Sequence, residues 1–180
     1  MIIELGHYAL VLALATCLVV SVLPVIGARR GDAAMMAVAT TGTYALFLLV
    51  AFSFAVLTYG YVVSDFSVQN VFQNSHSLKP MIYKVSGVWG NHEGSLLLWS
   101  LILAIFGASA ALFGQNLPPQ LKARVLAVQG MIGVAFLLFM LLTSNPFLRL
   151  EVPPLNGQDL NPLLQDPGLA FHPPFLYLGY

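Results

Sequence analysis

The sequence predicts an all-α, polytopic membrane protein, a bundle of about four spanning helices with the start of a fifth and irregular loops. Two observations carry this prediction. Hydrophobic residues make up 58% of the 180 residues and charged residues only 8%, whereas a soluble domain carries about 25% charged residues. Four long apolar runs also approach or exceed the roughly 20 residues that cross a bilayer as a helix. We expect one membrane domain over residues 1–180.

The apolar runs cover residues 5–26, 38–63, 96–113 and 125–143. A buried helix of a soluble protein would explain one such run, but four leave no amphipathic helix or strand to enclose them. The first run does not resemble a signal peptide, because no basic residue precedes it and it is long enough to span. A fifth apolar stretch begins at Phe175 and continues only to Tyr180. We therefore expect the chain to be the N-terminal part of a longer protein.

The basic residues predict the orientation. The two short loops carry Arg29 and Arg30 in the first, and Lys122 and Arg124 in the second. Both loops lie on the same side of the membrane by helix parity, and basic short loops are typically cytoplasmic. The N-terminus and the longer loops, residues 64–95 and 144–174, then face outward, away from the cytoplasm. The second long loop is rich in Pro, Gly, Asn and Asp, which favours an ordered but irregular surface layer.

Charge and cysteine content exclude several function classes. The seven acidic and seven basic residues cancel, so there is no electrostatic case for nucleic-acid binding. The apolar runs hold almost no ionisable residues, which counts against a proton pump or an ion-coupled transporter. The single cysteine, Cys17, cannot form an internal disulfide or carry out dithiol chemistry alone.

His172 is the main candidate for chemistry. It precedes Pro173 and Pro174 just before the fifth apolar stretch. Proline favours the first position of a helix, so we expect His172 at a helix start, where the helix dipole favours a neutral imidazole. A neutral imidazole is the form that binds haem iron. On the residues alone, however, a capping or interfacial histidine explains His172 better, because no second ligand is visible.

The other polar and aromatic residues have structural explanations. Asn91 can cap the third helix and Glu93 suits its positive end, which accounts for Asn91-His92-Glu93 without a catalytic pair. We expect His7, one turn from Glu4, to be interfacial, and His76 to be solvated. Aromatic residues that could line a ring-binding surface are Phe66, Phe72, Tyr83, Trp89, Trp99, Tyr177 and Tyr180. An aromatic belt at the membrane interface explains most of them better.

Several strings in the sequence together resemble a known family. They are Trp89-Gly90-Asn91-His92-Glu93-Gly94-Ser95-Leu96-Leu97-Leu98-Trp99, Leu142-Thr143-Ser144-Asn145-Pro146-Phe147, Asp65-Phe66-Ser67-Val68, and the segment from Leu160 through Phe171-His172-Pro173-Pro174 to Tyr180. They are similar to the front part of the CcmF family, the membrane subunit of the Ccm-type cytochrome c haem lyase. The resemblance covers essentially the whole chain.

The resemblance implies a function in cytochrome c maturation at the bacterial inner membrane. Family members receive haem from a periplasmic, CcmE-like chaperone and help attach it to apocytochrome c through thioether bonds. The implied partners are CcmH/CcmI-like subunits, apocytochrome c and the rest of the longer protein. The implied cofactor is haem, with His172 as one of two periplasmic histidines that bind its iron.

The second of these histidines lies beyond this chain, so we expect the chain alone to be inactive as a haem lyase. The alternatives are a membrane transporter and a scaffold subunit without haem chemistry.

Overall fold

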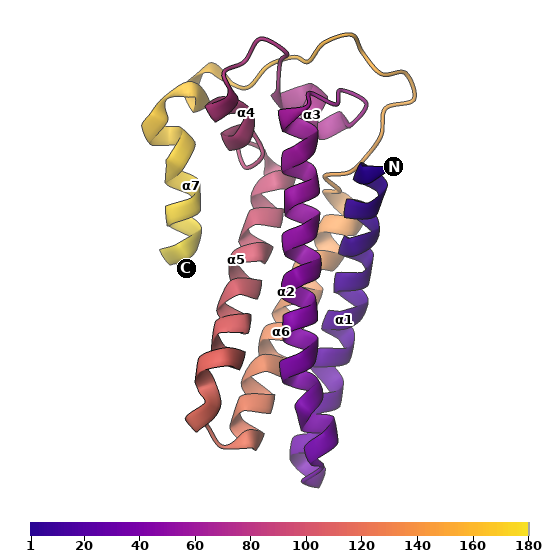
Figure 1. The fold of residues 1–180 in the computed structure, drawn as a ribbon, viewed down its shortest axis with the longest axis vertical. Coiled ribbons are helices and arrows are strands. Elements are labelled where there is room, and N and C mark those ends of the chain that lie inside the picture. Colours follow the sequence, from indigo (N-terminus) through magenta and orange to yellow (C-terminus); the bar gives the residue numbers. More distant parts are fainter. Residues whose placement is uncertain (180) are drawn as a thin grey trace.

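The computed structural model describes residues 1–179; Tyr180, one of the aromatic candidates, lies outside the described residues. Four long helices form a bundle (Figure 1): α1 (Ile2–Arg30), α2 (Ala33–Val62), α5 (His92–Phe113) and α6 (Pro119–Thr143). All four are long and apolar enough to cross a membrane, and the described residues contain no strand. The predicted all-α membrane bundle is therefore confirmed.

The helices are longer than the apolar runs at most ends, because polar residues and proline cap additional turns. Gly31 ends α1 in the left-handed conformation, with φ of 70°, which glycine adopts without steric cost. Asp32 then caps α2, and its side chain accepts hydrogen bonds from the amides of Ala34 and Met35. Pro119 occupies the start of α6, where its missing N–H costs nothing.

Small residues let the long helices approach one another closely. A Cβ added at Gly6 of α1 would lie 2.7 Å from Val56 of α2, and one at Gly133 of α6 would lie 2.8 Å from Cys17 of α1. The helix α1 packs along both α2 and α6. Without a strong hydrophobic force between helices in lipid, such close backbone packing is a main source of stability.

Short elements gather at one end of the bundle (Figure 1): α3 (Gln69–Asn74), α4 (Met81–Gly87) and the 3-10 helix η2 (Pro162–Gln165). At the opposite end a second 3-10 helix, η1 (Gly114–Asn116), joins α5 to α6. We call residues 64–91 and 144–166 the loop layer. After it, α7 (Pro167–Gly179) runs back down beside α5.

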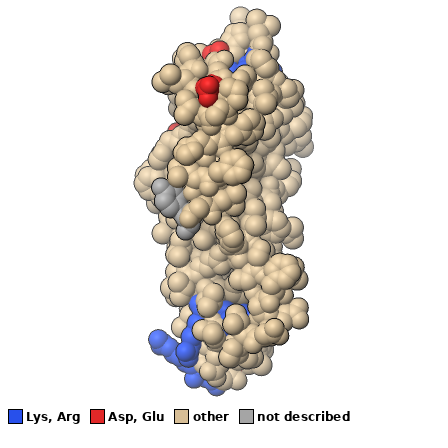
Figure 2. Space-filling view, turned by 90° about the vertical axis from the view of Figure 1, so that its left-hand side faces the viewer, with Lys and Arg blue, Asp and Glu red and all other residues tan. Residues whose placement is uncertain are grey.

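The two ends of the bundle differ in charge. The end opposite the loop layer carries four basic residues, Arg29, Arg30, Lys122 and Arg124, and one acidic residue, Asp32. The loop-layer end carries the three other basic residues and the six other acidic residues. Figure 2, which views the molecule from the side of α7, shows basic side chains gathered at the first of these ends and acidic side chains at the other. This is the asymmetry on which the orientation prediction rests.

The predicted start of the last helix was wrong. The helix α7 begins at Pro167, and the side chain of Asp166 accepts hydrogen bonds from the amides of Gly168 and Leu169, at 2.8 and 3.2 Å. Asp166-Pro167 is itself a helix-start pattern, a capping carboxylate followed by proline. His172 therefore lies in the middle of α7, and the helix-dipole argument for its imidazole does not apply.

Candidate functional site

His172 is exposed on the outer face of α7. Leu169, Phe175 and Leu176, at helical spacings of three and four residues, share this face and are 47%, 71% and 40% exposed. Among residues 1–179 the imidazole has no hydrogen bond, ion pair or ring contact. The helix thus presents an unengaged nitrogen donor on an apolar surface.

The inner face of α7 is fastened by the chain's two tryptophans. The indole Nε1 of Trp89 donates to the carbonyl oxygen of Ala170 at 2.7 Å. The ring of Trp99 stacks on Tyr177, with centroids 5.7 Å apart and planes inclined by 14°. A groove of about 400 Å³ lies at this face, lined by Trp89, His92 and Tyr177 among others. The sequence did not predict these contacts.

Trp89 is placed by the tight turn that precedes α5. Asn91 caps the helix as predicted, and its side chain accepts from the amide of Gly94 at 2.8 Å. The hydroxyl of Ser95 donates to the carbonyl of Trp89 at 2.7 Å. Only glycine fits at position 94, because a Cβ there would lie 1.6 Å from the carbonyl oxygen of Val88. The residues from Trp89 to Ser95 therefore form and cap the start of α5, and this turn holds Trp89 in place.

A buried polar network anchors this turn to the bundle. The hydroxyl of Tyr61, a fully buried residue on the last turn of α2, donates to the side-chain oxygen of Asn70 at 2.6 Å. The amide nitrogen of Asn91 donates back to that hydroxyl at 3.0 Å and to the carbonyl of Gly87 at 2.9 Å. Asn70 in turn donates to Asn91 at 2.8 Å. Because each group is paired, the network can be buried at low cost.

Residues 144–166, the second half of the loop layer and here called the crossing segment, carry the chain from α6 to α7. They pair with the first half of the layer through backbone hydrogen bonds: Gln69 N to Leu148 O, Leu150 N to Ser67 O, Gln158 N to Phe72 O, and Asp159 N to Ser75 O. Arg149 adds ion pairs to Glu4 at 2.6 Å and to Asp65 at 3.2 Å. The start of α7 is therefore set by contacts between segments that are distant in sequence.

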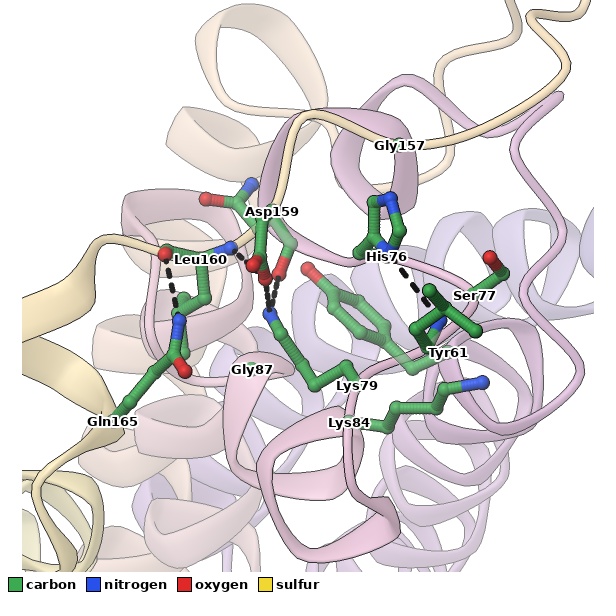
Figure 3. Close-up of polar contacts among 12 residues, drawn as sticks. Tyr61, His76, Ser77, Lys79, Lys84, Gly87, Gly157, Asp159, Leu160 and Gln165 are labelled. Carbon is green, nitrogen blue, oxygen red and sulfur yellow. Dashed lines mark hydrogen bonds and ion pairs between the residues drawn. The ribbon is translucent and has the colours of Figure 1, made fainter.

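An ion pair between Lys79 and Asp159 closes this assembly (Figure 3), with a separation of 2.8 Å. The Lys79 side chain is only 1% exposed, and its ammonium also donates to the carbonyl of Asn74 at 3.0 Å. Burial lowers the pKa of Lys79, although Asp159 opposes that shift. Burial alone would raise the pKa of Asp159, but hydrogen bonds from Lys79 and the Leu160 amide outweigh it and lower that pKa.

We expect Asp159→Asn to destabilise the loop layer by about 1–3 kcal/mol, because it leaves the buried Lys79 ammonium without its counter-charge. Lys79→Met should cost less, since it leaves only a half-exposed carboxylate that water can hydrate. Thermal unfolding of the detergent-solubilised protein measures both losses. Equal stability of Asp159→Asn and the unsubstituted protein would contradict this expectation.

The same ion pair predicts a pH dependence. The pKa of Asp159 in the folded protein lies below its ordinary value of 3.8. The contribution of Asp159 to the free energy of unfolding is therefore present above pH 3.8 and is lost as the pH falls through the folded-state pKa. The unfolding temperature of the unsubstituted protein should therefore approach that of Asp159→Asn in strongly acidic solution.

His7 and His76 both contact the crossing segment. His7 is 3.1 Å from the amide nitrogen of Asn145 and stacks on Phe147. His76 was expected to be solvated, but it is partly buried and lies 3.0 Å from the Asn156 amide nitrogen, because the crossing segment covers it. Among residues 1–179, no three His, Cys, Asp or Glu side chains gather as a candidate metal site.

The aromatic residues divide between core and groove. Phe66 is buried and Phe72 packs against the core, so neither belongs to an interface belt. Trp99 packs edge-on against Phe136 at 4.8 Å and, with Tyr177, lines a second, apolar groove of about 570 Å³. This groove lies along α5, α6 and α7 at the depth of the spanning helices.

Comparison with known proteins gives consistent matches. Residues 89–180 match the family model of cytochrome C assembly proteins. The whole chain is 67% identical over 180 residues to the cytochrome c-type biogenesis protein ccl1 of Rhodobacter capsulatus, of which it covers 28%. It is 68% identical to CycK of Rhizobium meliloti, covering 27% of that protein. It is also 52% identical over 178 residues to CcmF of Escherichia coli, covering 28%.

A solved structure shares the fold. The chain superposes on a cytochrome c haem lyase CcmF with a TM-score of 0.83 and 27% sequence identity. The match covers 99% of this chain and 28% of the other. The chain thus spans little more than a quarter of the length of the relatives that it matches.

Proposed function

Because the chain belongs to the CcmF family of cytochrome c assembly proteins, we propose that it acts in cytochrome c maturation by holding haem through His172 for transfer to apocytochrome c. The observation that carries this proposal is the exposed, unengaged imidazole on the apolar face of α7. A histidine whose nitrogens were already bonded within the fold would not be available to a ligand.

The residues around His172 fit a haem group. Haem is a flat, largely apolar ring whose iron accepts an axial imidazole. Leu169, Phe175 and Leu176 supply an apolar surface beside the imidazole, and the helix holds these side chains on one face. An isolated axial ligand binds weakly, which is consistent with a site that must later release its cargo.

The chain would contribute positioning and not acid–base chemistry. His172 would orient the ring at the loop-layer end of the bundle. The apocytochrome would supply the thiols for the thioether bonds, since the chain's own cysteine, Cys17, is fully buried in the bundle. A second axial ligand would come from a histidine outside residues 1–180.

The family and the four apolar helices support a multi-pass protein of the bacterial inner membrane. We propose that the loop layer and the N-terminus face the periplasm, because the basic residues lie at the opposite end. On this side the layer would meet a CcmE-like haem chaperone, CcmH/CcmI-like subunits and apocytochrome c.

The test is haem binding by the detergent-solubilised protein. His172→Ala is expected to weaken haem affinity at least about tenfold and to remove the absorption spectrum of imidazole-ligated haem, and added imidazole should restore that spectrum. His92→Ala is the matched control. His92, at the start of α5, lines the groove that the inner face of α7 borders, so its loss should leave the spectrum unchanged.

Unchanged haem binding and unchanged cytochrome c maturation in His172→Ala would refute the proposal and favour a scaffold without haem chemistry. A transporter would instead require polar or ionisable groups along the spans. Among the described residues, two polar side chains of α6 bond to carbonyls of α5: Gln129 to that of Leu103 at 2.7 Å and Lys122, at the basic end of the bundle, to that of Ala111 at 2.6 Å.

A further inference from the structure

The carbonyl of Ala170 lacks its usual helical partner. In an α-helix each carbonyl accepts from the amide four residues later, which for Ala170 would be residue 174. That residue is Pro174, which has no N–H. Ala170 is 4% exposed, so water cannot easily replace the missing donor, and an unpaired buried carbonyl is costly.

The indole of Trp89 supplies the missing hydrogen bond, at 2.7 Å from Nε1 to the Ala170 oxygen. Trp89 is itself held by the Ser95 hydroxyl on its carbonyl, at 2.7 Å. The tight turn that contains Trp89 is also bonded to the buried network, through the side chain of Asn91. The donor that replaces the proline N–H therefore belongs to a rigid part of another element.

This contact fixes the rotation of α7 about its own axis. Successive residues of a helix are about 100° apart, so His172 points roughly 200° away from Ala170. A helix held at Ala170 against the turn before α5 consequently presents His172 outward. The stacking of Tyr177 on Trp99 holds the lower part of the same face, but stacked rings can slide, whereas the hydrogen bond specifies one orientation.

We propose that Trp89 is a positioning residue for His172: its indole N–H replaces the amide that Pro174 lacks and so sets the direction in which the imidazole faces haem. This inference rests on the proposed function of His172. A simpler packing role for Trp89 would require its ring but not its N–H.

The test separates the N–H from the ring. Trp89→Phe keeps an aromatic ring and removes the donor. It should raise the hydrogen-exchange rate of the α7 amides roughly tenfold in the haem-free protein and weaken haem binding to a similar extent, with a changed ligand-field spectrum. Adding Pro174→Ala returns an amide to the Ala170 carbonyl, so Trp89→Phe with Pro174→Ala should recover both properties.

The matched control is Trp89→Phe with Pro173→Ala. That change returns an amide to the carbonyl of Leu169 and not to that of Ala170, so it should not recover either property. Equal recovery by the two alanine substitutions, or no effect of Trp89→Phe on exchange, would overturn the proposal. Exchange in α1 and α2 should stay unchanged in every variant, which excludes general misfolding.

The outcomes also separate this inference from the proposed function. If His172→Ala removes haem binding but Trp89→Phe changes only the exchange of α7, Trp89 has a structural role alone. If His172→Ala leaves haem binding intact, the proposed function fails and the positioning role fails with it, whatever the exchange data show about α7.

Discussion

Gly94→Ala is expected to prevent the loop layer from assembling on α5, with a loss of at least about 3 kcal/mol in the free energy of unfolding. The added Cβ would lie 1.6 Å from the Val88 carbonyl oxygen and 2.8 Å from its carbon. Both are backbone atoms in the tight turn that places Trp89, so no flexible side chain can move aside. The turn must open, and the Asn91 cap and the contact of Trp89 with α7 should be lost with it.

Gly114→Ala is the matched control, because Gly114 lies at the other end of α5 and a Cβ there meets only the flexible Leu117 side chain at 3.2 Å. We expect a change within about 1 kcal/mol for this variant. Membrane insertion and thermal unfolding in detergent measure the difference. A Gly94→Ala protein as stable as Gly114→Ala would show that the close approach to Val88 is not essential.

Asn91→Ala should destabilise the protein by about 3 kcal/mol. Loss of the cap on Gly94 accounts for about 1 kcal/mol, and the rest comes from the buried Tyr61 hydroxyl, the Asn70 amide and the Gly87 carbonyl, each of which loses one of its hydrogen bonds. Because the network links α2, α3 and the turn before α5, the effect should extend beyond α5.

Asn116→Ala provides a comparison at an exposed asparagine, in the turn that joins α5 to α6, and should be nearly neutral. Hydrogen exchange in α3 and the last turn of α2 tests the spread of the Asn91→Ala effect. If Asn91→Ala accelerated hydrogen exchange only in the first turn of α5, Asn91 would act only as a helix cap.

Local features of the candidate site could be predicted from the sequence. The cap by Asn91 followed from its place before an apolar run, because a cap depends on residues three positions apart. The start of α7 was misplaced, since two helix-start patterns, Asp166-Pro167 and His172-Pro173, occur within a few residues. The structure uses the first, with Asp166 as the cap, and the helix that starts there is held by the contact of Ala170 with Trp89, which joins residues 81 positions apart.

The sequence by itself determined that this chain forms spanning helices and which end carries the basic residues. Both are sums over local segments: the apolar length of a run decides whether it can cross a bilayer, and charge counts along the loops predict the orientation. Tertiary structure alone decided where His172 points. The proline that removes an amide from α7 is visible in the sequence, but the indole that replaces it comes from a distant turn, and a buried carbonyl accepts whichever donor the fold brings to it.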